Sequence, residues 1–414
     1  YTLKVGVEGS TKFQRAGRVS NWSQDTNSRA VFYQGTFNLT DSIAITAGAR
    51  YTEEEKRSHA VMDLTTNSTG DATPNSNGVL AAIVAGFNLG YAHEFDESRS
   101  SNQFLPAANI EWAQSEDSMF YLSYSEGFKS GGFNSVDDQA PAFTAAGIQP
   151  TVPGAGFEYD DENAESIELG GKHTLLDGGM TLNWALYDST YKNQQVSTFV
   201  GTSFVVTNAA STEIRGLEVD LQWQATDHLK LGASFALNDG EFGSYAGAGC
   251  TVAQQSGVLG LARALGRNLL QSTDPVTSFD GCQANFRGDG VQSGSSTDRT
   301  GDKVGVDYNG SLTVNYDRPV MNGMLWMTAL DINFTDSYPM IGGTLDPAQI
   351  QDAFSKTNFR TGLKGENWAV MLYGKNVFDE ITASGSFPIP LASGAFAEYT
   401  LPGSVWGATV NYNF

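Results

Sequence analysis

The sequence of 414 residues predicts an all-β fold, namely an antiparallel up-and-down β-barrel that spans a membrane with about fourteen strands. Apolar and polar residues alternate with a period of two along most of the chain, as they do in strands with one apolar face. Short turns and long loops alternate strictly between these segments, which is typical of outer-membrane barrels. No run of 18 apolar residues occurs, so a helical membrane span is excluded.

Composition excludes two other classes of protein. The chain carries 24 Lys plus Arg against 46 Asp plus Glu, which gives a net charge of −22. It is also 40% hydrophobic and 11% aromatic, too apolar for a disordered acidic chain. Nucleic-acid binding is disfavoured because an acidic surface repels the phosphate backbone.

The last ten residues show the alternation most clearly. Their apolar face is Trp406, Ala408, Val410, Tyr412 and Phe414, and their polar face is Gly407, Thr409, Asn411 and Asn413. A soluble β-sandwich also alternates, so the period alone does not decide between water and lipid. The connections decide it, because tight turns on one side and long loops on the other are the pattern of a membrane barrel.

The same reading places every element in order. Strands are expected near 1–9, 28–39, 43–60, 99–113, 118–130, 163–175, 180–194, 211–225, 228–240, 303–316, 324–336, 354–364, 368–378 and 404–414. Long connections are expected at about 62–98, 134–162, 195–210, 241–302, 338–353 and 380–402. A short packed helix is expected within 256–271, where Val258, Leu261, Leu265 and Leu269 have near-helical spacing.

Cysteine and histidine residues offer little chemistry. Cys250 and Cys282 can form one disulfide that closes a loop, which would indicate an oxidising compartment, or they can be two inert thiols. Neither has a metal-ligand spacing. The four histidines accompany no nucleophile or zinc-hydrolase motif, so we expect neither an enzyme nor a metal site.

The segment 121–134 resembles a signature strand of TonB-dependent outer-membrane receptors, most closely those of the ferric-siderophore type. The residues that carry this resemblance are Tyr124, Gly127, Phe128, Lys129, Gly131 and Gly132. Segments 165–172, 213–220 and 372–380 resemble further strands of that family in the same order. Trp406, Tyr412 and Phe414 resemble its C-terminal barrel-assembly signal, so the likeness covers nearly the whole chain.

The resemblance implies energy-coupled uptake of a scarce solute across the outer membrane of a Gram-negative bacterium, with no cofactor. Its expected partners are outer-membrane lipid and lipopolysaccharide, the TonB energy-transducing system and a small iron-chelate ligand, with no nucleic acid. Family barrels have about 22 strands around a plug. Residues 1–414 are therefore expected to be an N-terminally incomplete barrel domain without plug or TonB box. Residues 241–302 would be a long extracellular loop insert.

Site residues follow from position. Aromatic and Met side chains of the loops are expected to contact ligand, namely Phe157, Tyr159, Phe199, Phe204, Tyr245, Tyr338, Met340 and Phe387. Basic residues on polar faces are expected to point into the lumen, namely Arg50, Lys129, Lys172, Arg215 and Arg360. Gly127, Gly131 and Gly132 are expected where a strand bends or a neighbouring backbone comes close. Glu158, Asp160, Asp161 and Glu162 are expected to be solvated loop carboxylates, with calcium binding as the alternative.

Three other functions stay open at this point. The chain can be a passive diffusion channel complete at fourteen strands, about 28 Å across for strands ~4.8 Å apart. It can take a ligand other than iron, such as vitamin B12 or an oligosaccharide. It can also be an adhesive barrel whose loops bind a partner. Pairing of the first strand with the last would favour the complete channel.

Overall fold

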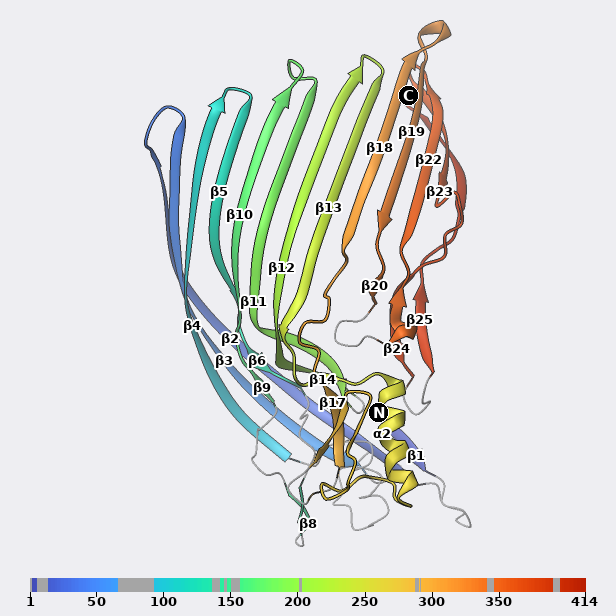
Figure 1. The fold of residues 1–414 in the computed structure, drawn as a ribbon. Helices are drawn as coiled ribbons and strands as arrows, with labels where there is room; N and C mark the ends of the chain where they lie inside the picture. Colours follow the sequence, from blue (N-terminus) through green and yellow to red (C-terminus); the bar gives the residue numbers. More distant parts are fainter. Residues whose placement is uncertain are drawn as a thin grey trace.

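Fourteen strands form a single antiparallel sheet in strict chain order in the computed structural model (Figure 1). The structure describes residues 2–5, 14–65, 93–135, 142–144, 147–149, 157–200, 203–286, 290, 292–340, 346–389 and 395–414. The sheet consists of β1 (Thr2–Val5), β2 (Gln14–Asn38), β3 (Ile43–Thr65), β4 (His93–Ser115), β5 (Ser118–Lys129), β10 (Glu162–Leu175), β11 (Met180–Val200), β12 (Ser203–Thr226), β13 (Leu229–Ser244), β18 (Tyr308–Pro319), β19 (Leu325–Thr335), β22 (Phe354–Lys364), β23 (Trp368–Lys375) and β26 (Val405–Tyr412). The predicted fold class and strand order are confirmed.

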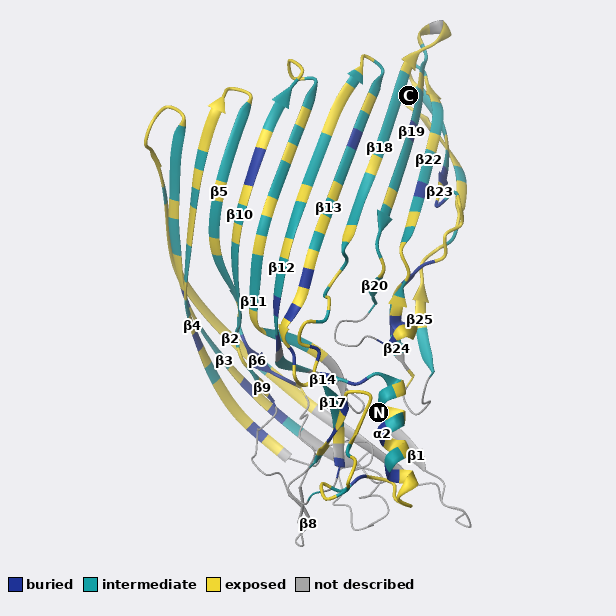
Figure 2. Ribbon diagram, in the orientation of Figure 1, coloured by how far each residue is buried: buried dark blue, intermediate teal, exposed yellow. Residues whose placement is uncertain are grey.

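Two faces run through the whole sheet because each register keeps apolar residues opposite apolar residues. Ile43 lies opposite Trp112, which lies opposite Phe120 on the next strand. Side chains on this apolar face are widely exposed, for example Val410 at 72%. Figure 2 accordingly shows little buried surface along the strands. An exposed apolar stripe on every strand is the pattern of a sheet that faces lipid. Among the described residues, no helix is both long and apolar enough to cross a membrane.

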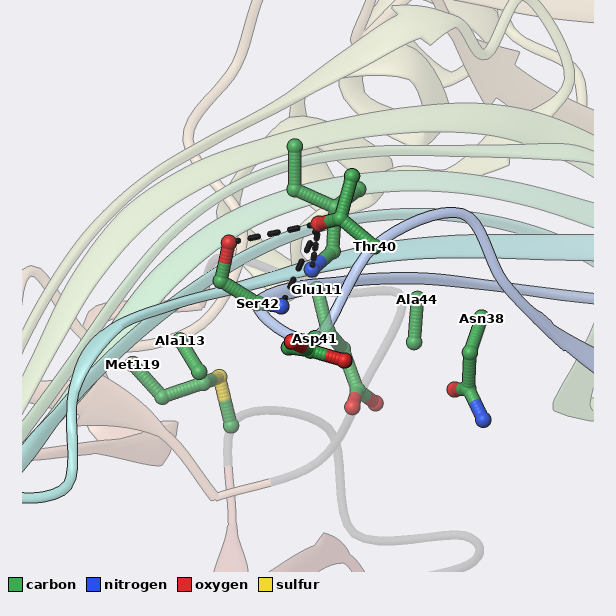
Figure 3. A pocket seen from close by; sticks show the side chains of 9 residues that line it. Asn38, Thr40, Asp41, Ser42, Ala44, Glu111, Ala113 and Met119 are labelled. Atoms are coloured by element: carbon green, nitrogen blue, oxygen red, sulfur yellow. Dashed lines mark hydrogen bonds between the residues drawn. The ribbon is translucent and has the colours of Figure 1, made fainter.

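Tight turns lie at one end of the sheet, at the top of Figure 1, and the long connections lie at the other. The turn between β2 and β3 shows how a short polar sequence closes a hairpin. The Thr40 hydroxyl accepts the N–H groups of Ser42 at 3.2 Å and Ile43 at 3.0 Å (Figure 3). A hollow of about 350 Å³ lies beside this turn and is lined in part by Asp41, Glu111 and Met119.

The edges of the sheet do not meet within the part of the chain that the structure describes. β1 pairs with β2 over Thr2–Val5 alone, and β26 pairs only with β23. The N–H and C=O groups along the outer edge of β2 beyond Gly17 therefore have no partner strand there. A barrel closed at fourteen strands, as the passive-channel alternative requires, is not what the structure shows.

Several strands are longer than predicted: β2 begins at Gln14 instead of near 28, β4 begins at His93 instead of near 99, and one predicted loop is strand. Residues 195–210 were expected to form a long connection, but β11 and β12 stay paired out to Val200 opposite Ser203. Register shifts between Tyr191 and Gln195 interrupt the ladder, and Asn193 has a φ of 53°. Such a bulge breaks the regular alternation of side chains, so the sequence pattern beyond it no longer looks like the strand that it continues.

Smaller elements gather at the loop end. They are the strand pairs β6 (Gly132–Phe133) with β9 (Glu158–Tyr159), β7 (Ala142–Thr144) with β8 (Gly147–Gln149), β20 (Tyr338–Pro339) with β21 (Ile350–Gln351), and β24 (Ala383–Pro388) with β25 (Phe396–Thr400). A four-stranded sheet combines β14 (Ala248–Gly249), β17 (Gln292–Thr297), β16 (Cys282–Phe286) and β15 (Ser278–Phe279). A short 3₁₀ turn at Pro347–Gln349 (η2) also lies at this end, whereas the one at Met321–Gly323 (η1) lies in the tight turn between β18 and β19 at the opposite end.

The predicted loop helix is present but begins earlier than expected. It is α2 (Val252–Ala264), which starts at a capping box formed by Thr251 and Gln254. Val258 and Ala262 are its buried residues, whereas Leu265 and Leu269 lie beyond its end and are exposed.

Candidate functional site

The signature segment turns back across the polar face of the sheet as soon as β5 ends. This polar face, on which Arg50, Lys129 and Lys172 lie, is the side opposite the apolar stripe. β6 and β9 pair through Gly132 opposite Tyr159. The segments 130–135 and 157–161 thereby rest on the outer parts of β3 and β4, and we call this arrangement the signature clamp.

Two buried cations hold the clamp. Lys56 of β3 donates to the Ser130 hydroxyl and the Gly131 carbonyl, each at 2.6 Å. Arg99 of β4 contacts the Asp161 carboxylate at 2.9 Å and also donates to the Tyr159 carbonyl. Only 8% of the Arg99 side chain is exposed, so its charge is almost entirely balanced by protein groups.

Asp161 receives three hydrogen bonds in addition to this ion pair. The donors are the Gly131 N–H at 2.7 Å, the Ser101 hydroxyl at 2.7 Å and the Gln103 amide at 3.1 Å. Burial alone would raise the pKa of Asp161. The hydrogen bonds and the charge of Arg99 outweigh burial, so the pKa of Asp161 is lowered from its ordinary value.

This lowered pKa predicts an acid-sensitive clamp. A depressed folded-state pKa means that Asp161 stabilises the folded clamp above its ordinary pKa of 3.8 and loses this effect as the pH falls through the lower folded value. We expect the difference in thermal midpoint between the wild-type protein and Asp161→Asn to be constant above about pH 5 and to shrink below about pH 4. Near-UV circular dichroism of the two proteins in detergent measures this difference. A difference that grows on acidification would contradict the expectation.

Two of the three signature glycines are required by close packing. A Cβ atom on Gly131 would collide with the Tyr159 carbonyl and lie 2.5 Å from the Arg99 guanidinium. One on Gly132 would lie 2.7 Å from the Tyr159 hydroxyl. Close packing does not require a glycine at position 127, where a Cβ atom would meet nothing within 4 Å.

The glycines give a matched pair of variants. Gly131→Ala is expected to destabilise the clamp by about 1–3 kcal/mol, because backbone or a buried cation must move. Gly127→Ala is expected to be neutral or to stabilise by about 0.5 kcal/mol, because alanine restricts the unfolded chain. Hydrogen exchange of residues 130–135 in the purified protein measures the effect of both substitutions. Equal exchange in the two variants would remove the steric argument.

Apolar packing and amide bonds complete the clamp. Phe157 is fully buried against Phe95, with ring centroids 4.1 Å apart, and joins Ala60 and Phe133 in one cluster. Asn134 exchanges two hydrogen bonds of 2.8 Å with the backbone of Val206 on β12. Phe157 was expected to contact ligand, but its complete burial makes it a packing residue, which corrects that prediction.

The other predicted ligand contacts divide into three groups. Tyr245 is 1% exposed and packs on Phe242, so this prediction is also wrong in this structure. Tyr159, Tyr338, Met340 and Phe387 are partly exposed at the loop end. Phe199 and Phe204 lie opposite each other on β11 and β12, and their side chains lie outside the described part of the structure.

Four of the five predicted lumen cations lie on the polar face, but Arg215 does not. Arg215 lies opposite Asp188 in the row that contains Leu217, Val219 and Leu221, which is the apolar face. It binds Asp188 at 2.8 Å and is largely exposed. The prediction failed because Arg215 lies on the outward face of its strand, just beyond the last apolar residue of that face.

Arg360 belongs to a wider cationic groove of about 1080 Å³ on the polar face of the last six strands of the sheet, from β13 to β26. The groove is lined by Lys230, Arg360, Lys364 and Lys375, together with the carboxylates of Asp317 and Asp331. Within the described ranges, none of the four cations forms an ion pair. This groove is positive in a protein whose net charge is −22.

The insert between β13 and β18 is a small folded unit. A disulfide joins Cys250 and Cys282, and these residues pack with Val258, Ala262, Leu270 and Ala284 in one buried cluster. Helix α2 supplies Val258 and Ala262 to this cluster, and strand β16 of the four-stranded sheet supplies Cys282 and Ala284.

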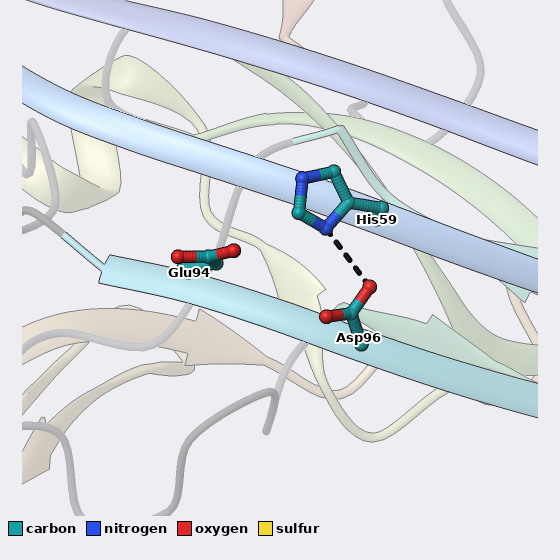
Figure 4. A group of neighbouring side chains, drawn as sticks. All are labelled: His59, Glu94 and Asp96. Carbon is teal, nitrogen blue, oxygen red and sulfur yellow. Dashed lines mark hydrogen bonds and ion pairs between the residues drawn. The ribbon is translucent and has the colours of Figure 1, made fainter.

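A second group of titratable side chains lies on the outward face of β3 and β4. His59, Glu94 and Asp96 place ligand atoms within 4.8 Å of one another, and His59 Nδ1 lies 2.8 Å from Asp96 (Figure 4). All three are exposed. Exposed groups of this kind are common on acidic surfaces, so we assign no metal site to them.

An antiparallel sheet with lipid-type outer residues, tight turns at one end and folded loops at the other defines the outer-membrane β-barrel class. Residues 5–377 match the family described as TonB dependent receptor-like, beta-barrel. The chain belongs to this family, whose members are receptors and not enzymes.

Solved structures show the same fold. The ferric yersiniabactin uptake receptor FyuA from Yersinia pestis has a TM-score of 0.64 at 14% identity, over 97% of this chain and 50% of that one. The siderophore receptor PiuA from Acinetobacter baumannii has a TM-score of 0.56 at 16% identity, over 94% and 44%. The ferric-catecholate import receptor Fiu from E. coli K12 has a TM-score of 0.58 at 12% identity, over 97% and 50%. The chain therefore spans about half the length of these receptors.

Proposed function

We propose that the chain is the C-terminal part of the barrel of an outer-membrane receptor that takes up a ferric-siderophore complex with energy from the TonB system. The observation that carries this proposal is the family match over residues 5–377. The fold is also that of structures named as receptors for ferric yersiniabactin and ferric catecholates. Residues 1–414 would be one barrel domain of a Gram-negative outer membrane, and residues 241–302 its extracellular insert.

The open edges of the sheet support an incomplete barrel. The outer edge of β2 beyond Gly17 and that of β26 have no partner strand among the described residues. A membrane barrel has no free edges, because unpaired N–H and C=O groups are very unfavourable in lipid. About eight further strands, as in a 22-strand barrel, would join these edges around a plug.

Charge supports an anionic or polar iron chelate as the ligand. The cationic groove and the polar-face residues Arg50, Lys129 and Lys172 offer positive charge along the lumen side, while the chain as a whole is acidic. This local positive charge attracts an anion that the rest of the acidic surface repels. Tyr159, Tyr338, Met340 and Phe387 are the proposed loop contacts that remain.

Growth of a strain that lacks the complete receptor gene tests the function. With iron limited, we expect the deletion to lose growth on at least one ferric siderophore and to recover it with the intact gene but not with a gene whose TonB box is deleted. The same strains are also grown with vitamin B12 or an oligosaccharide as the limiting nutrient. Loss of growth only on B12 or only on the oligosaccharide would replace the iron assignment. Unchanged growth on every nutrient would sink the receptor proposal.

A further inference from the structure

Helix α2 of the insert has its N-terminus completed by a residue from a different loop. The first N–H groups of a helix have no partner within the helix and attract negative charge. The Thr251 hydroxyl accepts from Gln254 N–H at 3.2 Å, but the first turn contains no acidic residue. Asp346, which is 94 residues away in the connection between β19 and β22, accepts the Val252 N–H at 2.9 Å.

Asp346 is placed for this contact by its own loop. Its other carboxylate oxygen accepts the Ala348 N–H at 3.2 Å and so caps η2, while its carbonyl accepts the Gln349 N–H at 2.8 Å. Asp346 is only 7% exposed. A buried carboxylate that accepts from two separate loops ties them firmly, because losing either donor would leave an oxygen unsatisfied.

The same short segment holds a third loop. The Gln349 side chain is buried and donates to the Ser386 carbonyl at 3.4 Å. Gln351 accepts the Ala383 N–H at 2.8 Å. Contacts thus run from the insert through residues 346–351 to the hairpin of β24 and β25.

The disulfide lies at the start of this chain of contacts. Cys250 is bonded to Cys282 and directly precedes the helix cap Thr251 and the donor Val252. The insert therefore presents the Val252 N–H from a covalently fixed point. Figure 1 shows α2, β24 and β25 at the same end of the sheet, the one with the long connections.

We propose that Asp346 is a positioning residue for ligand capture, because its contact with Val252, which we call the latch, locks the insert to the β19–β22 loop. Gln349 and Gln351 join the β23–β26 loop to the same preformed unit. The part of the proposal that concerns capture rests on the proposed function. Partly exposed Tyr338, Met340 and Phe387 belong to two of these three loops and would hold a fixed relation to the insert. A preformed unit binds ligand without the cost of ordering loops first.

Asp346→Asn in the complete receptor is the central test. Asparagine keeps one oxygen for the cap of η2 but offers an amide in place of the oxygen that accepts from Val252. We expect hydrogen exchange of residues 252–258 to rise about tenfold while exchange in β18 and β19 stays unchanged. Asp352→Asn removes the same charge from an exposed site of the same loop and should change nothing. Unchanged exchange in Asp346→Asn would overturn the latch.

Ligand kinetics separate positioning from a purely structural role. With the ferric siderophore identified by the growth test, Asp346→Asn should slow association at least threefold and leave the number of sites and the thermal midpoint of the barrel unchanged. Wild-type association kinetics would overturn the capture role even if exchange changes. Absence of binding by the wild-type receptor would refute the proposed function, while the exchange result would still decide the latch.

Discussion

Replacing Arg99 by methionine is expected to open the signature clamp, with a loss of about 3–5 kcal/mol in the free energy that keeps residues 130–135 and 157–161 closed. Methionine retains much of the apolar length but leaves Asp161 buried without its cation. Glu158 at 3.2 Å from Arg99 loses its partner as well. Native-state hydrogen exchange of the purified receptor measures this free energy.

Arg57→Met is the matched control. Arg57 lies on the neighbouring strand and also pairs with a carboxylate, Glu55 at 2.8 Å, but its side chain is 71% exposed. An exposed pair contributes roughly 0–1 kcal/mol, so this variant should leave the clamp closed. If both variants changed exchange equally, the burial of Arg99 would not be what matters.

Removal of the disulfide is the second large effect that we expect. Cys250 and Cys282 are 32 residues apart, and a loop of that length corresponds to about 3–4 kcal/mol in the chain-entropy account. The Cys250→Ser, Cys282→Ser double variant should therefore lose protection of α2 and of the small sheet, while the fourteen barrel strands remain protected. Exchange and limited proteolysis of the intact receptor report on both regions.

Reduction of the wild-type receptor provides the comparison for the disulfide. It should reproduce the pattern of the double variant, because both remove the same covalent link. Reduction also keeps the sulfur atoms of Cys250 and Cys282 in the buried cluster with Val258 and Leu270, which the serine substitutions do not. Full protection of α2 after reduction would mean that packing alone holds the insert.

The strands were predictable because the alternation of apolar and polar residues is a property of each short segment of sequence. Each strand carries its own alternation, and the turn residues such as Thr40 also lie within a few positions of one another. The strand pairing over residues 195–210 was missed, and a loop was predicted there instead, because a bulge near Asn193 interrupts that pattern. Arg215 was assigned to the wrong face although Leu217 and Val219, two and four residues later, already define the face on which it lies.

The clamp and the latch could not be predicted in the same way. Lys56, Arg99 and Asp161 come from three separate segments, and each looks like an ordinary polar position of a strand or loop. Only the register of β3 with β4 and the return of β9 bring them together. Phe157 and Tyr245 looked like exposed loop aromatics because sequence alone does not show which loops fold over one another.

The length of β2 bears on how such a receptor could change its ligand. Its 25 residues cover about 80 Å of strand, whereas the lipid zone takes only about 10 residues. More than half of this strand is thus wall above the membrane, with its backbone fixed by the ladder to β3. Substitutions at polar-face positions of this part of β2 can change the side chains that face the solute without disturbing how the loops fold. New ligand specificities can therefore evolve on a rigid surface.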